Sequence, residues 1–117
     1  WGVTVEDARE GYALVRMKVR DDMLNGHRIA HGGMIFALAD TAFAYACNSR
    51  NETTVAQSAT ISFLAPAQAG DVLMAEAEEA SRVGRSGVYH VRVKTADGRM
   101  IAEFTGLTRT TGGSVIN

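Results

Sequence analysis

The residues best suited to chemistry lie in one stretch, Asn25–Gly33, and in the apolar segment that follows it. Two adjacent glycines, Gly32 and Gly33, stand where that segment begins. Glycine lets another molecule approach the backbone closely, and the first N–H groups of a helix carry the positive end of its dipole. If the segment is a helix, its start can stabilise negative charge on an oxygen. A tight entry turn would use the same two glycines, so both interpretations stay open at this point.

Asp40 is the only charged side chain in the apolar segment Met34–Cys47. We expect this segment to be a buried helix, and burying an isolated carboxylate is costly. One explanation is structural: the carboxylate is paired with an arginine or with backbone N–H groups. The other is functional: it is a general base for water, or the direct nucleophile, in the cleavage of an activated acyl bond.

The spacing of Gly32 and Asp40 constrains how they could act together. Eight residues of helix span about 12 Å, so one scissile carbonyl cannot touch both in the same chain. Two helices lying antiparallel across a dimer would bring Gly32 of one chain to Asp40 of the other. Asn25 and His31 stand near the helix entrance and could position water or the acyl group. An asparagine that caps a loop and a histidine that orders it would look the same.

A second group of polar residues joins two strand-like segments at Arg82–Gly87. It holds two guanidinium groups, a hydroxyl and two glycines, supplied by Arg82, Arg85, Ser86, Gly84 and Gly87. Guanidinium groups suit a ligand that carries phosphates. A solvated hairpin loop has the same composition, so the pattern alone does not decide between the two.

The composition narrows the class of protein. A chain of 117 residues with 46% hydrophobic residues fits one globular domain over 1–117. A net charge of -1, from 12 basic and 13 acidic residues, gives no attraction for nucleic acid. No apolar run is long enough to cross a membrane. The chain opens on Trp1, so we allow for a short preceding element.

The single cysteine and the histidines point away from disulfides and metal chemistry. Cys47 cannot form an internal disulfide, which favours a reducing, cytoplasmic compartment, and we expect it to be an inert core residue. His27 and His90 have no second ligand at metal-binding spacing. We therefore expect no bound metal and no cofactor.

Apolar residues that alternate with polar ones predict strands with one buried face. The predicted strands cover 12–20, 58–65, 72–80, 89–94 and 99–110. The pair Asp97-Gly98 favours a tight hairpin between the last two. The segment 34–47 is apolar around nearly its whole circumference, so we expect a helix buried on all sides.

A chain this small can enclose one helix only by curling its sheet around it, which predicts an α+β hot-dog fold. Such a sheet is wet on its outer face and exposed at its edges. Pairing with a second copy of the chain usually relieves both conditions. We therefore expect self-association.

These residues resemble one known family. Asn25-Gly26-His27, His31-Gly32-Gly33 and the helix sequence from Leu38 to Asn48 are similar to PaaI-type thioesterases of bacterial phenylacetate degradation. The likeness continues along the chain in Ser62-Phe63-Leu64-Ala65-Pro66, Ala69-Gly70-Asp71, Gly87-Val88-Tyr89 and Thr111-Gly112-Gly113. It covers nearly the whole chain, and the His-Gly-Gly plus Asp combination is specific to one branch of hot-dog enzymes.

The resemblance implies an acyl-CoA thioesterase and assigns roles by position. Gly32 would donate its N–H to the thioester carbonyl and Asp40 would be base or nucleophile. Supporting roles would fall to Asn25, His31 and Thr41, with Gly33 beside the substrate. The turn Arg82, Gly84, Arg85 and Ser86 would lie near CoA. Related enzymes place a serine on the strand after the helix, for which Ser58 is a weak candidate.

The resemblance further implies a tetramer of two back-to-back dimers with sites at the dimer interface. The implied acyl groups are phenylacetyl and its ring-hydroxylated forms. A hot-dog dehydratase or isomerase is the nearest alternative, because fold does not decide function. Such enzymes use a histidine inside the site, whereas this helix offers Asp40 without histidine. A non-catalytic acyl-CoA binding protein is the other alternative, in which Asp40 would have no kinetic role.

Overall fold

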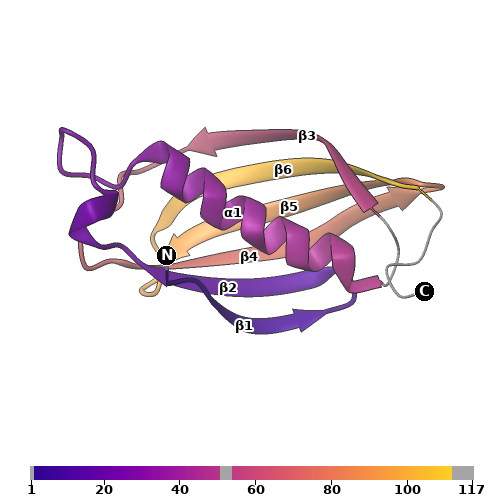
Figure 1. The fold of residues 1–117 in the computed structure, drawn as a ribbon, viewed down its shortest axis with the longest axis horizontal. Helices are drawn as coiled ribbons and strands as arrows, with labels where there is room; N and C mark the ends of the chain where they lie inside the picture. Colours follow the sequence, from indigo (N-terminus) through magenta and orange to yellow (C-terminus); the bar gives the residue numbers. More distant parts are fainter. Residues whose placement is uncertain (1, 51–53, 112–117) are drawn as a thin grey trace.

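The computed structural model describes residues 2–50 and 54–111, without the side chain of Arg50. Within them the elements in chain order are β1 (Thr4–Arg9), β2 (Tyr12–Lys18), η1 (Asp21–Met23), α1 (Gly32–Cys47), η2 (Asn48–Arg50), β3 (Thr54–Phe63), β4 (Val72–Val83), β5 (Ser86–Thr95) and β6 (Met100–Thr110). The strands form one antiparallel sheet in the order β1-β2-β4-β5-β6-β3, and α1 lies across it (Figure 1).

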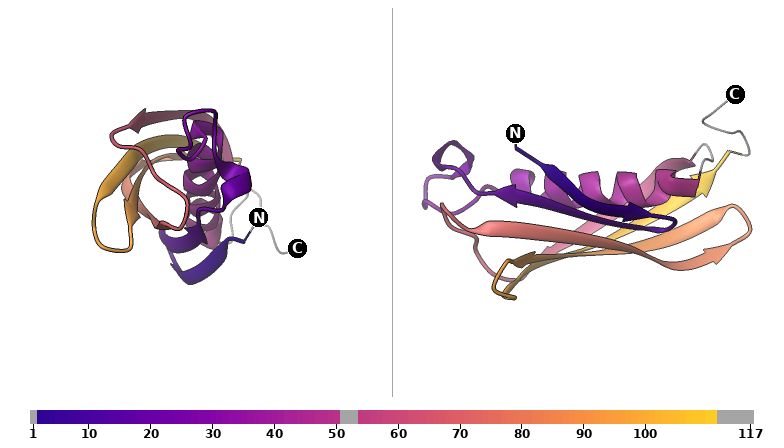
Figure 2. Two further views of the ribbon diagram at one scale, coloured as in Figure 1. Left: turned by 90° about the vertical axis from the view of Figure 1, so that its left-hand side faces the viewer. Right: turned by 90° about the horizontal axis from the view of Figure 1, so that it is seen from below.

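The sheet curls around α1, which confirms the predicted hot-dog architecture (Figure 2). Alternate residues of the central strands point inward and are buried against the helix. They include Ala13, Val15 and Met17 of β2, Leu73, Ala75 and Ala77 of β4, and Tyr89, Val91 and Val93 of β5. The period-two patterns in the sequence therefore identified the inner face correctly.

Aromatic packing fixes the helix on the sheet. The ring of Phe43 lies edge-on to Tyr89, with 5.6 Å between ring centroids, and 5.5 Å from the centroid of Phe104. Gly106 of β6 makes room for it, because a Cβ there would stand 2.5 Å from the Phe43 ring. Interiors packed to crystal density have no slack for such an overlap, so the glycine is required by this contact.

The predicted elements are found with changed ends. β1 was not predicted, because all six of its residues are exposed and show no alternation of burial. The turn between β4 and β5 is shorter than the segment 82–87. Val83 pairs with Ser86, which leaves only Gly84 and Arg85 in the loop. The turn after Thr95 is confirmed, with Gly98 at a φ of 95°.

The prediction that α1 is buried on all sides is wrong for the single chain. Its buried residues face the sheet, and they are Ile35, Leu38, Ala39, Ala42, Phe43, Ala46 and Cys47. The sheet does not cover the opposite face in the end-on view (Figure 2), and Asp40, Ala44 and Tyr45 on that face are exposed. The physical reason is that six strands wrap only one side of the helix. An exposed apolar face of this kind is typical of an interaction or ligand-binding site.

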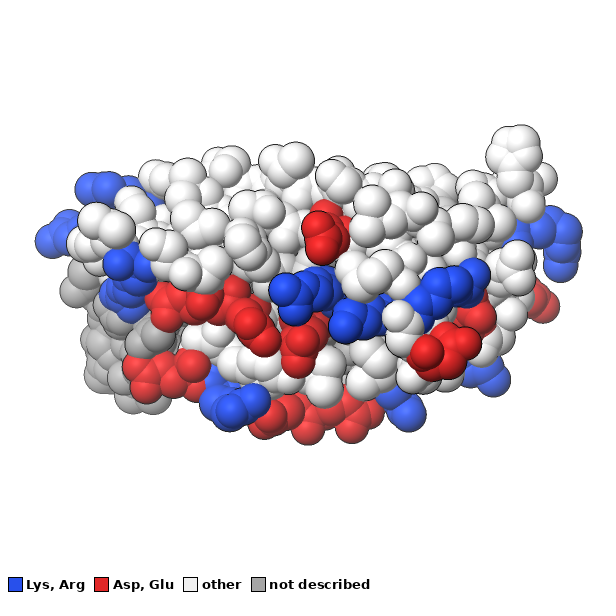
Figure 3. Space-filling view, turned by 180° about the vertical axis from the view of Figure 1, so that it is seen from behind, with Lys and Arg blue, Asp and Glu red and all other residues white. Residues whose placement is uncertain are grey.

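The outer face of the sheet carries charges of both signs close together (Figure 3). Cross-strand pairing places Arg92 of β5 between Glu76 of β4 and Glu103 of β6. Opposite charges on neighbouring strands stabilise a sheet modestly. This face therefore presents no continuous positive field to a polyanion. In the part of the chain that the structure describes, no helix has the length and apolar character needed to cross a bilayer.

Candidate active site

The start of α1 is held by His31. Its backbone N–H donates to the carbonyl of Met23 at 2.8 Å, and its ring Nδ1 accepts the N–H of Gly33 at 2.9 Å. His31 is thus the N-cap of the helix. Because Nδ1 acts as the acceptor, the neutral ring carries its proton on Nε2. The structural role anticipated for this histidine is therefore present, and an Nε2–H donor remains at the helix entrance.

Gly32 offers the first N–H of the helix to a ligand. The next three N–H groups are occupied, since those of Gly33, Met34 and Ile35 all donate to His31. No acceptor for the Gly32 N–H is found among residues 2–50 and 54–111. At a helix start this donor points toward the region that favours negative charge. The Phe63 ring lies over the glycine, with Cζ 3.1 Å from the place where a Cβ would stand.

Asn25 orders the loop that leads to the helix. Its Oδ1 accepts the N–H of His27 at 2.9 Å and that of Ile29 at 3.4 Å. Arg28, inside the loop, has a φ of 62°, a left-handed conformation that a non-glycine residue seldom adopts. The side-chain oxygen of Asn25 is thus committed to the loop. Its amide NH2 remains as the group that could donate to a substrate.

A groove of about 400 Å³ opens beside Gly32. Its walls are mostly apolar and comprise Asn25, Ile29, Ala30, Gly32, Ile35, Phe63, Leu64, Ala65 and Pro66. Phe63 and Leu64 are both more than half exposed. Backbone donors along the groove are occupied, because Ala30 donates to Ala67 and Leu64 to Ile101. A ligand in this groove would therefore meet hydrocarbon, the Gly32 N–H and the Asn25 amide.

Asp40 lies on the exposed face of α1, and the expectation that its carboxylate is buried is wrong for the single chain. α1 is unbroken from Gly32 to Cys47, so Asp40 stands about 12 Å along the axis from Gly32. Within one chain the structure does not bring the two together. Thr41, the next residue, donates its hydroxyl to the carbonyl of Ala37 at 2.8 Å, inside the helix.

The structure does not place Ser58 with the other candidate site residues. Its neighbour Ala59 pairs with Gly106, the residue that faces Phe43 inside the sheet. Successive residues of a strand point to opposite faces, so Ser58 points to the outer face. The residue was proposed from a register that the sequence could not fix. A bulge between Ala56 and Ser58 shifts that register by one residue.

The arginine turn lies far from the start of α1 in the same chain. The tip between β4 and β5 is at the end of the molecule where α1 ends, opposite the Asn25 loop (Figure 1). Gly84 has a φ of 60°, which a two-residue hairpin loop needs at its first position. Arg82 and Arg85 are exposed and Ser86 is half-buried. Of the other matched motifs, Gly112 and Gly113 lie outside the described residues.

Cys47 is not poised as a nucleophile. Burial raises the pKa of its thiol, and the nearby charge of Asp40 acts in the same direction. A thiol held protonated is a poor nucleophile and a poor metal ligand. Within the described residues no cluster of three or more His, Cys, Asp or Glu side chains is arranged to hold a metal ion. The groups that remain for chemistry are thus the carboxylate of Asp40 and the backbone N–H of Gly32.

Two apolar wall residues of the groove, Phe63 and Leu64, were not proposed from the sequence as site residues. The available signal was a run of large apolar residues, Phe63-Leu64, at the end of a strand just before Pro66. Such a run is equally typical of the end of a buried core strand, so it does not by itself indicate a binding site. Only the exposure of both side chains separates the two interpretations.

Comparison with known proteins defines the class. Residues 27–102 match the thioesterase superfamily, and the chain belongs to that superfamily, a group of thioester hydrolases to which its hot-dog fold conforms. It is 43% identical over 114 residues to acyl-coenzyme A thioesterase PaaI of Escherichia coli K12, spanning 97% of this chain and 81% of that protein.

Solved structures agree with this assignment. The structure of E. coli PaaI, from the phenylacetic acid degradation operon, covers 96% of this chain and 81% of its own, with a TM-score of 0.92 and 43% identity. A hypothetical thioesterase of Streptococcus pneumoniae TIGR4, crystallised with coenzyme A, has a TM-score of 0.90 and 26% identity, covering 97% of this chain and 91% of its own. The family resemblance found in the sequence is therefore confirmed.

The cap made by His31 gives a prediction that separates its structural role from any chemical one. His31→Ala removes the acceptor for the Gly33 N–H and should lower the free energy of unfolding by about 0.5 to 2 kcal/mol. His31→Asn supplies a new acceptor and should recover most of that loss. Urea unfolding at one fixed protein concentration measures both. An equal loss in the two variants would show that the ring stabilises the loop by packing and not as a cap.

Proposed function

We propose that this protein is an acyl-CoA thioesterase that hydrolyses phenylacetyl-CoA or its ring-hydroxylated forms in phenylacetate catabolism. The observation that carries the proposal is that one helix, α1, has both a free Gly32 N–H at its start and the exposed carboxylate of Asp40 further along. The similarity to E. coli PaaI supports the substrate class. We place the enzyme in the cytoplasm, which the single, buried Cys47 favours.

The active site is shared between two copies of the chain. On the open face of α1, Gly33, Ala37 and Ala44 are small, so a second helix can approach closely. β3 is at the edge of the sheet, and most of its residues are exposed. An edge of this kind is suited to pairing with the same strand of another copy. Antiparallel helices would then set Gly32 of one chain against Asp40 of the partner subunit. Two such dimers, back to back, would form the tetramer.

Each group has a role in the hydrolysis. The thioester oxygen accepts the Gly32 N–H, which stabilises the negative charge that develops there. Asp40 of the partner subunit takes a proton from water as the water oxygen attacks the carbonyl carbon, or attacks that carbon itself to give an anhydride that water then opens. The carbon–sulfur bond breaks, CoA leaves as its thiolate, and the proton passes to it. The His31 Nε2–H and the Asn25 amide help to position the water or the acyl group.

The remaining residues hold these groups in place or bind CoA. Gly33 lies beside the substrate, and Thr41 keeps its hydroxyl in the helix, where it stiffens the turn next to Asp40. In an antiparallel dimer, the β4–β5 turn of one chain comes toward the Gly32 end of the other. Arg85, with Arg82 and Ser86 beside it, would then face the phosphates of CoA. Ser58, on the outer face, has no part in this arrangement.

The direct test is the variant Asp40→Asn. The amide is nearly isosteric with the carboxylate but can neither attack a carbonyl nor accept a proton. The variant should therefore lose nearly all turnover of phenylacetyl-CoA, by about 100-fold or more, while fold and assembly are unchanged. Release of the CoA thiol, followed with a chromogenic reagent, measures the rate. Hydrolysis by purified Asp40→Asn at the parent rate would show that Asp40 is not catalytic.

Arg85→Ala tests the contact with CoA. A charge-assisted bond near the surface should make the apparent KM for acyl-CoA rise roughly 5-fold to 100-fold, with a smaller change in kcat. The effect should weaken as salt is added, because the charge is exposed.

The control is a thioester of N-acetylcysteamine, which has no nucleotide. The parent and Arg85→Ala should hydrolyse it with similar efficiency. Equal losses on the two kinds of thioester would mean that Arg85 supports the fold or the chemistry, and the turn would then be only a solvated hairpin.

A further inference from the structure

The loop that leads to the start of α1 has an arginine at a backbone position that favours glycine. Among the described residues, Arg28 is the only one other than glycine with a positive φ, at 62°. The proposed mechanism gives its side chain no role. We propose that Arg28 binds the diphosphate of CoA at the mouth of the groove beside Gly32. This inference rests on the proposed function, because it takes an acyl-CoA as the substrate.

Hydrogen bonds make this segment a short hairpin with a three-residue loop. The Asn25 N–H donates to the carbonyl of Ile29 at 2.9 Å, and the Arg28 N–H donates to the carbonyl of Asn25 at 3.0 Å. Such loops end on a left-handed residue, which is usually glycine. The glycine of this loop, Gly26, is not left-handed and has open space where a Cβ would stand. The fold alone would favour glycine at position 28, which indicates a role for the arginine side chain outside the loop.

The guanidinium group of Arg28 is available to a ligand. The side chain is exposed, and no ion pair within residues 2–50 and 54–111 involves it. In the segments on either side, Asp22 pairs with Arg20 at 3.2 Å. Asp71 pairs with Arg99 at 3.0 Å. A guanidinium group without an internal partner suits a phosphate from outside the chain.

The loop is fixed at the edge of the groove. Asn25 and Ile29, which flank the tip of the hairpin, both line the groove that contains Gly32. Ile29 also forms a β-bridge with Gln68, which ties the hairpin to the segment after β3. A side chain on an ordered loop loses less backbone freedom when it binds a ligand. Arg28 is thus held at the mouth of the groove before CoA arrives.

The reach of Arg28 fits the length of CoA. About thirteen bonds join the sulfur of CoA to the nearer phosphorus of its diphosphate, and they span about 15 Å when extended. Arg28 stands four residues before Gly32, so their Cα atoms are at most about 14 Å apart, and the guanidinium extends about 6 Å further. A diphosphate about 15 Å from a thioester at Gly32 is therefore within reach. Arg85 of the partner subunit would meet the same phosphates from the second chain.

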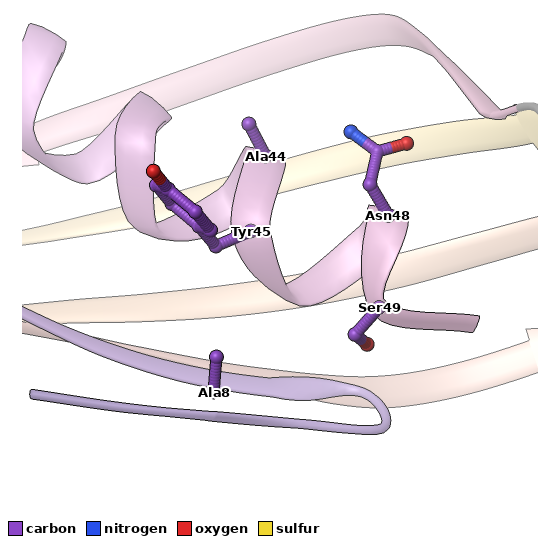
Figure 4. Close-up of a pocket in the computed structure, with 5 residues that line it drawn as sticks. All are labelled: Ala8, Ala44, Tyr45, Asn48 and Ser49. Carbon is purple, nitrogen blue, oxygen red and sulfur yellow. The ribbon is translucent and has the colours of Figure 1, made fainter. Parts of the chain in front are cut away.

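A groove at the opposite end of α1 has no such cation. Its volume is also about 400 Å³, and it is lined by Ala8, Ala44, Tyr45, Asn48 and Ser49 (Figure 4). None of these residues is charged. Of the two grooves, the one beside Gly32 is therefore suited to the thiol arm of CoA and to the phosphates beyond it.

The test compares the parent with Arg28→Gly and Arg28→Asn on phenylacetyl thioesters of CoA, dephospho-CoA, 4′-phosphopantetheine and pantetheine. Glycine and asparagine both tolerate the left-handed conformation, and neither is charged. Each variant should raise KM roughly 3-fold to 30-fold on the three thioesters that keep the nearer phosphate, with little change in kcat. On the pantetheine thioester, which has no phosphate, the variants and the parent should have the same KM.

Two controls separate this contact from effects of net charge and of folding. Lys18→Gln removes an exposed cation from the outer face of β2 and should leave all four KM values as in the parent. Thermal unfolding at one protein concentration should give Arg28→Gly the parent Tm or a Tm up to about 5 °C higher, because glycine relieves the strained φ. A rise in KM in a variant this stable is not a folding defect.

An unchanged KM for phenylacetyl-CoA in both variants would overturn the inference. A rise of the same size on the pantetheine thioester would also overturn it, because Arg28 would then only support the loop. A rise confined to the CoA thioester would place the contact at the 3′-phosphate and contradict the assignment to the diphosphate. Failure of the proposed function looks different. In that case the parent hydrolyses none of the four thioesters, or Asp40→Asn hydrolyses them as fast as the parent.

Discussion

The structure depends on one constraint: α1 is apolar on nearly every side, but the sheet of its own chain covers only one of its faces. Six strands curl around α1 and bury one face, and the Phe43 ring fixes that face against Tyr89 and Phe104. The other face stays open, with Asp40 and Tyr45 on it. Burial of apolar surface is the main favourable term in folding and association, so the open face favours a second copy of the chain. The need for a partner and the location of the chemistry thus have the same origin.

The start of α1 provides the hydrogen-bond donor of the proposed active site. His31 satisfies the second N–H of α1 and leaves the first, that of Gly32, for a ligand. A donor fixed before the substrate arrives costs little reorganisation when charge develops on the carbonyl oxygen. The same glycine allows the Phe63 ring to close over the helix start. Two adjacent glycines and a histidine are therefore explained together, by a cap, a donor and a close contact.

Much of the fold could be predicted from the sequence. The alternation in β2, β4 and β5 identified the inner face, and Asp97-Gly98 identified the last hairpin, because both depend on local chemistry. β1 was missed because an exposed edge strand has no alternation to detect. The helix pattern showed that α1 is apolar all round, but it could not show which side the sheet covers. That depends on how far six strands curl. The register at Ser58 could not be predicted for a related reason, since a bulge in β3 leaves no mark in the sequence.

The central claim is that Gly32 of one chain and Asp40 of another act on the same carbonyl, and subunit mixing tests it most directly. Asp40→Asn and Gly32→Val should each be inactive alone. After subunit exchange, about a quarter of the parent activity should return, because half of the dimers in a random mixture are hybrids and each hybrid has one intact site of two. Mass spectrometry would confirm that hybrids form. If hybrids form and no activity returns, the two residues do not act across the dimer and the account of the active site is wrong.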